Sequence, residues 1–499
     1  MSATVAIQPR SAGEARARVR ALLGTPVVLA GLLACLTFCF CCLHFSDPDT
    51  WWHLKVGQEV WNTHTVPMAD HWSFTVYGHP WLPHEWLSEL FLYAIFHFFG
   101  YAGLQLWLCL AASAIVVLSY ALCYRYCGDA NVAALGGFLT FFFGSIGFSI
   151  RPQVVGYLFL VVELLLLQRA FSGKPRTLWC MPVLFAVWVN CHGSYPLGLG
   201  ILVAAVGCWC WRYRCVGRHV RFLAAVVLVS AAALLCNPVG WRLLTYPFDA
   251  LVHQQDGLNF SQEWLPTTIQ DVRGFGLVLV VAAIGVAALA GRARASLFEL
   301  LVFVPVTVLA IQHLRMLFVF GIVCAPLVSR IVADLRGPRA PSRDHLPTNA
   351  VLLGLIALLC FAMFPSAGRI EADVEARNPV KAVEFIRQAR LAGPMMNDYK
   401  WGGYLVWALP EHRIFIDGRA DVFDWAGVLR RYRQWVSLES DPARLLDDYR
   451  VGFCLLPANG AQAHVMQHLA GWRQAYSDSV AAVFVRAEAA GPLSAVAVR

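Results

Sequence analysis

A succession of long apolar segments determines what this chain can fold into. The first covers residues 21–44, and eleven more precede residue 366. About twenty apolar residues cross the hydrocarbon core of a bilayer. Only 14% of the residues are charged, against about a quarter in soluble proteins. The chain is therefore predicted to be an α-helical polytopic membrane protein. The later segments are 85–99, 101–122, 129–149, 153–168, 177–191, 195–211, 219–236, 274–290, 297–312, 314–331 and 348–365.

Clusters of basic residues indicate how these segments are oriented, because cytoplasmic loops are rich in Lys and Arg. Such clusters precede the first segment and lie between several later ones. All of them become cytoplasmic if segment 85–99 lies at the outer interface or re-enters without crossing, which leaves eleven crossings. We therefore expect a cytoplasmic N-terminal tail at 1–20, a transmembrane domain at 21–365 and an extracytoplasmic α/β domain at 366–499. The first segment is expected to stay in place, because no small-residue cleavage site follows it.

The formal charge of +8 does not indicate a nucleic-acid partner, because the basic residues lie in those short clusters. The 16 cysteines fall almost entirely within or beside apolar segments, where they read as small apolar residues. No zinc-finger spacing, phosphate-binding loop or dinucleotide fingerprint is present. These absences argue against ATP-driven transport by this chain.

An acidic motif, Asp47-Pro-Asp49-Thr-Trp-Trp-His53, follows the first segment and opens a predicted extracytoplasmic loop at 45–84. Carboxylates at the water–lipid boundary are costly unless they are solvated, paired or metal-bound. In an extended stretch the two Asp side chains would point to one side, about 7 Å apart. They could then share a cation, bind a sugar hydroxyl or supply a general base. The alternative is a solvated loop that ends the helix at Pro48. The many histidines among the loop's tryptophans favour a binding surface over a simple aromatic belt.

Further polar residues stand at segment ends on the same predicted outer face. His84 and Glu85 begin the re-entrant segment, and Arg151 precedes another. An arginine there is expensive unless it faces an anion or a cavity, and a guanidinium binds phosphate through two hydrogen bonds. Each position alone reads as a helix terminus or a turn. Together they predict one polar ring of substrate-binding residues, namely Trp52, His53, His84, Glu85, Arg151, Gln153, His192, Asn237, Glu263, His313 and Arg315.

The distal region, 366–499, is polar enough to be a soluble α/β domain. We expect helices near 378–391, 401–409 and 425–449, and strands at 394–397, Arg413–Asp417, Gly452–Leu456 and 480–486. Two motifs follow strand ends, NDYKWGGY and FIDGRAD. Open α/β folds place binding loops there, whereas Gly and Asp are also ordinary turn residues, and both interpretations stand. The candidate distal binding residues are Asn397, Tyr399, Trp401, Asp417, Arg419 and Asp421.

These motifs resemble a known group of membrane enzymes. A first helix followed by an acidic motif and a long loop with juxtamembrane helices resembles the GT-C superfamily of glycosyltransferases, in the branch of glycosyltransferase family 39 and its bacterial relatives. Where that family commonly has Asp-Glu, this chain has Asp47-Pro-Asp49, and the spacing to Gly57 matches Asp49 to the family's catalytic Asp. More closely, the chain resembles a bacterial set that shares the DPD-x-WWH start and the RPQ, HGS, WGGY and IDGR-x-D motifs.

The resemblance implies transfer of a sugar from a polyprenyl-phosphate-linked donor to an extracytoplasmic glycan, lipid or protein acceptor. The enzyme would lie in the bacterial inner membrane and would usually invert the anomeric carbon. Asp49 would act as the base, Asp47 would assist through a divalent cation (Mg²⁺ or Mn²⁺), and Arg151 or Arg315 would hold the lipid phosphate. The departure from Asp-Glu leaves the metal and the base open. The main alternative is a transporter or flippase of a lipid-linked saccharide without catalysis. A non-catalytic scaffold and a metal-dependent hydrolase are further alternatives.

Overall fold

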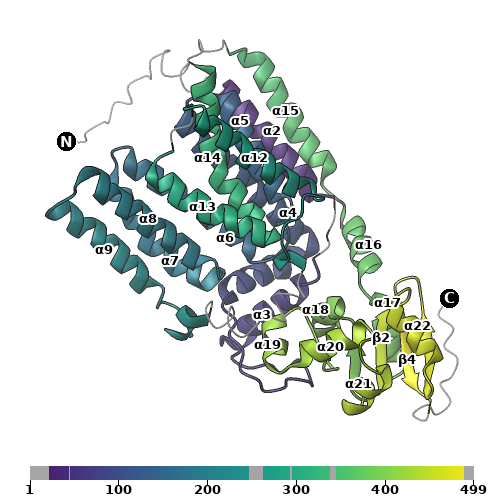
Figure 1. Cartoon of the computed structure of the whole chain (residues 1–499). Coiled ribbons are helices and arrows are strands. Elements are labelled where there is room, and N and C mark those ends of the chain that lie inside the picture. Colours follow the sequence, from purple (N-terminus) through teal and green to yellow (C-terminus); the bar gives the residue numbers. More distant parts are fainter. Residues whose placement is uncertain are drawn as a thin grey trace, which may run out of the picture.

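The protein is a bundle of apolar helices with a small α/β domain against one end of it (Figure 1). The computed structural model describes residues 22–43, 45, 47–246, 262–292, 295–337 and 344–487. The predicted cytoplasmic tail, 1–20, lies outside the described residues.

The bundle helices follow the predicted apolar segments closely. Six of the described helices are long and apolar enough to cross a bilayer, namely α4, α6, α8, α12, α14 and α15, so the chain is an integral membrane protein. Shorter apolar helices complete the bundle. The helices are α2 (Thr25–Cys41), α4 (Trp86–Cys127), α5 (Ala130–Gly144), α6 (Gln153–Phe171), α7 (Cys180–Cys191), α8 (Tyr195–Tyr213), α9 (Arg218–Ala233), α12 (Val272–Leu289), α13 (Leu297–Gln312), α14 (Leu317–Arg336) and α15 (Leu346–Met363), with 3₁₀ turns η1 (Pro175–Trp179), η2 (Gln262–Trp264) and η3 (Leu314–Met316).

The region after α2 differs from the predicted loop. Residues Thr50–Thr63 form a helix, α3, with Trp51, Leu54 and Val60 among its buried side chains. Its apolar residues recur with helical spacing, and its C-terminus is closed by His64 in the left-handed conformation (φ 56°). About a third of the expected open loop at 45–84 is thus helical. Helix α4 in turn breaks at Gly100 (φ 59°), where the sequence separated segments 85–99 and 101–122.

The C-terminal domain has a four-stranded sheet in the order β1-β2-β4-β3. Strand β1 pairs with β2 in parallel, and the other two pairs are antiparallel. The strands are β1 (Met395–Asn397), β2 (Phe453–Pro457), β3 (Trp472–Ser477) and β4 (Ala481–Arg486). The helices are α16 (Ala367–Arg377), α17 (Val380–Gln388), α18 (Gly402–Ala408), α19 (Ala420–Trp425), α20 (Val428–Val436), α21 (Pro442–Asp448) and α22 (Ala461–His468), with the 3₁₀ turn η4 (Tyr399–Trp401).

The predicted strand Arg413–Asp417 is wrong, and strand β3 was not predicted. Ile414 bridges to Ser73 of the segment between α3 and α4 instead of joining the sheet. The amide of Ile414 donates to the carbonyl of Trp72 (3.0 Å), and the amide of Phe74 donates to the carbonyl of Ile414 (3.1 Å). The extended backbone was therefore correctly recognised, but its partner lies far away in the sequence.

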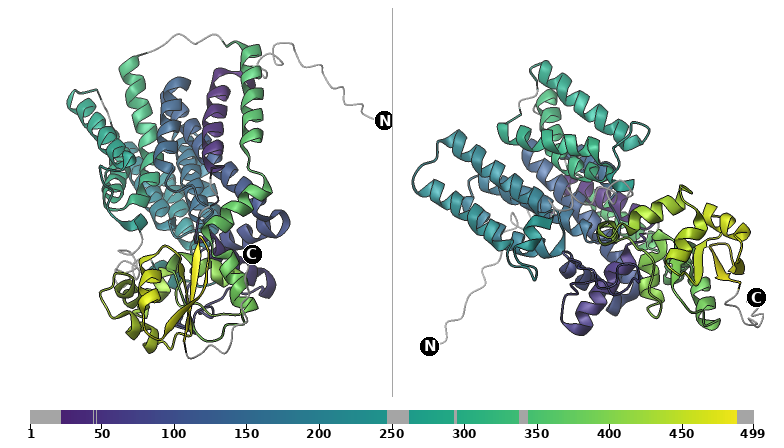
Figure 2. Two further views of the ribbon diagram at one scale, coloured as in Figure 1. Left: turned by 90° about the vertical axis from the view of Figure 1, so that its right-hand side faces the viewer. Right: turned by 60° about the horizontal axis from the view of Figure 1, so that its bottom comes forward.

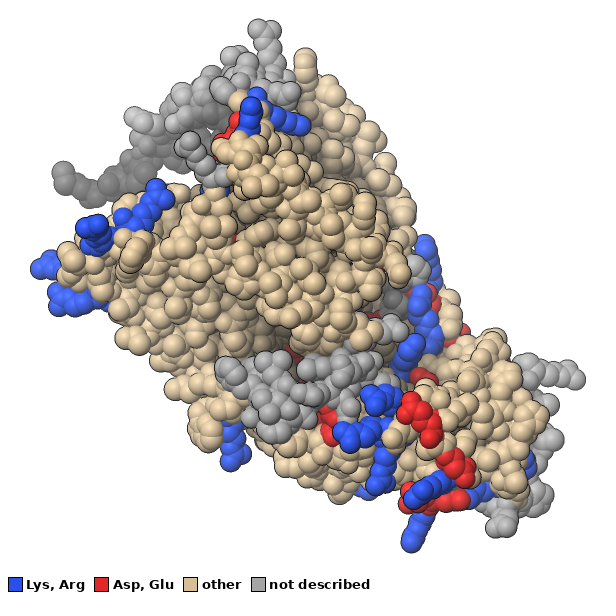
Figure 3. Space-filling model, viewed as in Figure 1, with Lys and Arg blue, Asp and Glu red and all other residues tan. Residues whose placement is uncertain are grey.

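Several connections between helices carry the predicted polar residues, and they meet at one end of the bundle. The C-terminal domain lies against this end (Figure 2). Figure 3 shows a band of uncharged surface along the helices, with Lys and Arg side chains beyond it at the far ends and mixed charges on the C-terminal domain. A band of this kind fits a bilayer core, where uncompensated charge is costly.

Candidate active site

Arg151 holds three carboxylates together between the bundle and the segment after α2. Its Nε lies 2.8 Å from Asp47, its Nη2 lies 2.7 Å from Oδ2 of Asp49, and its Nη1 lies 2.8 Å from Oε1 of Glu263. Charge-assisted hydrogen bonds of this length are among the strongest in proteins. Acidic residues from two segments, the one after α2 and the one before α12, thus meet at the guanidinium of Arg151.

The acidic motif is a turn that starts a helix, not the extended stretch we expected. The amide of Asp49 donates to Oδ1 of Asp47 (2.9 Å), and Asp49 is the N-cap residue of α3. The Thr50 hydroxyl donates to the carbonyl of Ile150 (3.1 Å), which fixes this turn beside Arg151. The two carboxylates therefore meet through a shared guanidinium, which takes the position expected for a cation.

Asp49 has the environment of a base that titrates near neutral pH. Burial raises the pKa of Asp49 to about 7, and the negative charge of Asp47 acts in the same direction while Arg151 opposes both. Its side chain keeps 21% of its surface exposed, so a hydroxyl group can reach it. A carboxylate with a raised pKa is a stronger base than an ordinary Asp.

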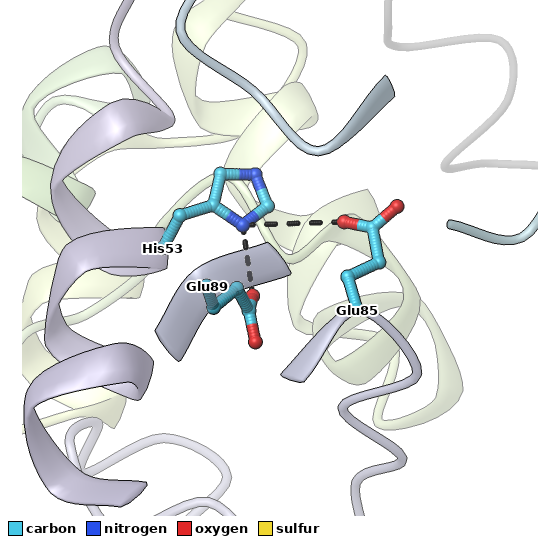
Figure 4. Close-up of side chains that lie close together, drawn as sticks. All are labelled: His53, Glu85 and Glu89. Atoms are coloured by element: carbon cyan, nitrogen blue, oxygen red, sulfur yellow. Dashed lines mark hydrogen bonds and ion pairs between the residues drawn. The ribbon is translucent and has the colours of Figure 1, made fainter. Parts of the chain in front are cut away.

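A second cluster lies where α3 meets the start of α4 (Figure 4). Nδ1 of His53 is 2.8 Å from Oε1 of Glu89 and 3.9 Å from Oε2 of Glu85. Gly57 permits this contact, because a Cβ at that position would lie 2.2 Å from the carbonyl oxygen of Glu89. Burial raises the pKa of Glu85 and, together with the charge of Arg151, lowers the pKa of His53 well below its usual range.

Two more histidines face Glu85, namely His84, its neighbour in the chain, and His192 from the link between α7 and α8. Nε2 of His192 lies 3.5 Å and Nε2 of His84 lies 3.6 Å from Oε1 of Glu85. The amide of Ser194 donates to Nδ1 of His192 (3.2 Å), and the Ser194 hydroxyl, which accepts from Trp188, lies 2.8 Å from the same nitrogen. Nδ1 is therefore an acceptor, and the remaining proton of His192 points towards Glu85 from Nε2.

Arg315 is a second arginine of this region. Its Nη2 donates to Oε1 of Gln153 (3.2 Å), and its guanidinium stacks 4.7 Å from the ring centre of Trp264. His313 supports that ring, since its Nδ1 lies 2.8 Å from the carbonyl of Trp264. Among the described residues no carboxylate forms an ion pair with Arg315, whereas Arg151 has three such partners. Its positive charge also acts on the pKa of Glu85 and His192.

The two glycine motifs of the C-terminal domain pack directly onto the acidic turn. A Cβ at Gly418 would lie 2.0 Å from Oδ1 of Asp49, and a Cβ at Gly403 would lie 2.9 Å from the carbonyl oxygen of Pro48. Both positions require glycine because the backbone approaches so closely. The Tyr399 hydroxyl donates to the carbonyl of Gly418 (3.4 Å). The motifs are therefore contacts between domains rather than solvent-exposed turns.

A buried ion triad fastens this contact. Arg419, whose side chain is 1% exposed, donates to Asp417 (2.7 Å) and to Asp70 (2.6 Å). Its guanidinium packs against the rings of both Trp72 (4.5 Å) and Trp81 (4.8 Å), which contact each other edge to face. Asp70, Trp72 and Trp81 all belong to the segment between α3 and α4. We call these five residues the interdomain clamp.

Several predicted residues have local structural contacts instead. Asn237 caps the turn after α9 through the carbonyl of Leu234 (2.7 Å), Asn397 holds the 415–416 backbone, and Trp401 donates to the carbonyl of Arg377 (3.0 Å). Asp421 differs, because its contact is long-range: it accepts a hydrogen bond from the hydroxyl of Tyr246 (2.9 Å), whose ring lies tilted against that of His84 with the ring centres 5.0 Å apart.

Sequence reasoning overlooked Asp70, Ser194 and Tyr246 as members of the site. Ser194 stood within the HGS motif, which was the available signal. Asp70 and Tyr246 carried no comparable signal, because each makes its contact across a long stretch of chain.

Comparison with solved structures identifies the fold. The oligosaccharyltransferase of Archaeoglobus fulgidus, tethered with an acceptor peptide, superposes with a TM-score of 0.54 at 13% identity, covering 88% of this chain and 70% of that chain. The same organism's AglB, in complex with an inhibitory peptide and a dolichol-phosphate, gives 0.53 at 11% identity, covering 93% and 74%. ArnT from Cupriavidus metallidurans gives 0.52 in its apo state and 0.50 bound to undecaprenyl phosphate, at 13% identity, covering 97% of this chain and all of that one.

No family model matches the chain, and the search of curated proteins found no match. The structural matches are remote in sequence and extend over nearly the whole chain. The resemblance drawn from the acidic motif is therefore confirmed at the level of fold: the chain has the fold of the GT-C membrane glycosyltransferases.

Proposed function

We propose that this protein transfers a sugar from a polyprenyl-phosphate-linked donor to an extracytoplasmic acceptor, with Asp49 as the base. The observation that carries the proposal is the environment of Asp49, a partly exposed carboxylate with a pKa raised to about 7 at the junction of bundle and C-terminal domain. The fold supports it, since neighbours with this fold were solved with dolichol-phosphate and undecaprenyl phosphate.

The reaction is a single displacement at the anomeric carbon. The acceptor hydroxyl gives its proton to a carboxylate oxygen of Asp49, and its oxygen forms a bond to the anomeric carbon. The bond from that carbon to the phosphate oxygen breaks, and its electron pair leaves with the polyprenyl phosphate. The configuration is inverted, because attack and departure take place on opposite faces. General-base assistance of this kind contributes about 10²- to 10⁴-fold in rate.

Arg315 is our candidate for the leaving phosphate. It stacks on Trp264 and forms no ion pair with a carboxylate among the described residues, so its charge is available to an anion. The charge of Arg151 is already offset by Asp47, Asp49 and Glu263, and we assign Arg151 to positioning the base. A guanidinium placed where negative charge develops lowers the barrier electrostatically.

The test uses the full-length protein in lipid nanodiscs with a panel of radiolabelled polyprenyl-phosphate sugars and candidate acceptors. The wild type is expected to release or transfer the labelled sugar. Asp49→Asn, which keeps the size of the side chain, should lose at least about 100-fold in rate with unchanged donor binding. Saturable donor binding without turnover in the wild type would contradict the proposal and favour a transporter or flippase.

A further inference from the structure

The cluster of His53, Glu85 and Glu89 is not explained by the proposed transfer reaction. One ligand atom from each of the three side chains lies within 4.8 Å of the other two. Figure 4 shows both carboxyl groups approaching the same imidazole nitrogen. The side chains of His53 and Glu89 are 3% and 1% exposed and that of Glu85 is 15% exposed, so the group meets solvent only at Glu85.

Two buried carboxylates need a positive partner or a proton. Among the described residues only histidines form ion pairs with Glu85 and Glu89. In addition, Oε2 of Glu89 is buried without a hydrogen-bond partner among the described residues. The cluster thus offers one imidazole and two carboxylates. No Lys or Arg among the described residues forms an ion pair with either carboxylate, and the charges of Arg151, Arg315 and Arg419 act on the cluster only from a longer distance.

A second layer of contacts holds the ligands in place. The far oxygen of Glu85 faces Nε2 of His192 and His84, and His192 is itself fixed by Ser194. The ring of His53 packs 3.6 Å from that of Trp52. Outer contacts that orient ligating carboxylates and imidazoles are typical of metal sites.

We propose that His53, Glu85 and Glu89 bind a divalent transition-metal cation. Tetrahedral coordination at 2.0–2.2 Å places ligand atoms about 3.4 Å apart, and the observed separations from His53 Nδ1, 2.8 and 3.9 Å, bracket that value. An imidazole with two carboxylates suits Zn²⁺ or Mn²⁺ better than Mg²⁺, which prefers oxygen ligands. The site is separate from Asp47 and Asp49, each of which forms an ion pair with Arg151 instead. It does not depend on the proposed reaction, because cation binding is measured without any donor.

The test measures the metal content of the full-length protein in nanodiscs. After chelation and reloading with Zn²⁺, mass spectrometry should find one equivalent in the wild type. Co²⁺ in place of Zn²⁺ should give d–d absorption bands. Glu89→Gln and Glu85→Gln should each fail to bind the equivalent of Zn²⁺ and should not show the Co²⁺ absorption bands. His192→Ala, which removes an outer contact, should weaken binding by about 10- to 100-fold.

The matched control is Glu59→Gln, which removes the carboxylate of another His–Glu pair (Glu59–His71, 3.0 Å) in the same segment, more exposed to solvent. It should keep the full equivalent. Thermal unfolding midpoints of the chelated proteins separate a folding defect from lost ligands, and Glu85→Gln, at a partly exposed position, serves if Glu89→Gln does not fold. A wild type that binds no stoichiometric cation overturns the proposal. Two other results overturn it as well: both Glu variants fold and keep the bound Zn²⁺, or only Asp47→Asn loses it.

Discussion

Asp49 and Asp47 contact the same guanidinium, yet they are placed differently. The carboxylate of Asp47 accepts a hydrogen bond from the backbone amide of Asp49, whereas the carboxylate of Asp49 lies against the backbone of Gly418. Burial raises the pKa of Asp49 to about 7, so that its carboxyl group is protonated below that pH and accepts a proton only above it.

The pH dependence of the rate should therefore follow this residue. We expect kcat/KM to rise with pH through about 7 as Asp49 loses its proton. Asp47→Asn should shift this rise in kcat/KM to lower pH, because the substitution removes a negative charge that raises the pKa of Asp49. The measurement is kcat/KM from pH 5 to 9 for both proteins. If kcat/KM rises over the same pH range in the variant as in the wild type, a group other than Asp49 titrates.

Donor binding should depend on Arg315. Arg315→Ala is expected to raise the KM for the donor about 10- to 100-fold, because a hydrogen bond to a charged group contributes about 1.5–3 kcal/mol. Arg273→Ala is the control, since Arg273 is neutralised by its neighbour Asp271 (2.7 Å). Equal effects of the two substitutions on KM would argue against a phosphate contact at Arg315.

At the residue scale the sequence identified the main charges, and their partners were less predictable. Asp47, Asp49, Arg151 and Glu263 were all expected on one face, because they follow or precede apolar segments. Their convergence on Arg151 depends on how the links fold, which segment spacing does not encode. Asp70 was not predicted, because it meets Arg419 across 349 residues of sequence.

At the scale of elements, the close approach of Gly418 to Asp49 connects the C-terminal domain with the base. Glycine is needed there because a Cβ would lie 2.0 Å from a carboxylate oxygen. The approach also limits how far the Asp49 side chain can rotate.

Gly418→Ala should therefore displace Asp49 or the segment that covers it. We expect a loss of kcat larger than the loss of stability, which overpacking places at about 1–3 kcal/mol. Gly368→Ala, in α16, is the control, because nothing lies within 4 Å of its added Cβ. Kinetics and thermal unfolding of both variants give the comparison, and an unchanged kcat in Gly418→Ala would contradict the contact.

Apolar helices were predictable as elements because bilayer length and hydropathy determine them. Helix α3 was not predicted. Its apolar residues recur with helical spacing, but its aromatic and polar residues also resemble an interface loop, and the packing against α4 that favours the helix is a long-range contact. Likewise the extended segment Arg413–Asp417 was visible, but the bridge from Ile414 to Ser73 is long-range pairing that local pattern cannot reveal.

At the scale of the whole molecule, the interdomain clamp joins two regions whose other polar contacts include the hydrogen bond from Tyr246 to Asp421. Breaking a buried ion pair by removing one partner costs about 3–5 kcal/mol, because the remaining charges stay buried. Removal of the Arg419 side chain would leave two carboxylates, those of Asp417 and Asp70, buried without their cation.

Arg419→Ala should accordingly loosen the C-terminal domain from the bundle. We expect a lower unfolding midpoint and faster proteolysis between α15 and the domain. Arg387→Ala breaks an exposed pair with Glu411 and should cost less than about 1 kcal/mol. Equal protease resistance of Arg419→Ala and wild type would show that the clamp contributes little.

The dependence of the site on Gly418 has a consequence for the timing of biosynthesis. Gly418 leaves the ribosome roughly 370 residues after Asp49, a delay of about 20 to 70 s at typical rates of synthesis. During that interval the helices from α4 to α15 are made, while the carboxylate has no cover. A newly made molecule therefore acquires its finished site only when its last quarter has been translated, delivered to the same side of the membrane and folded.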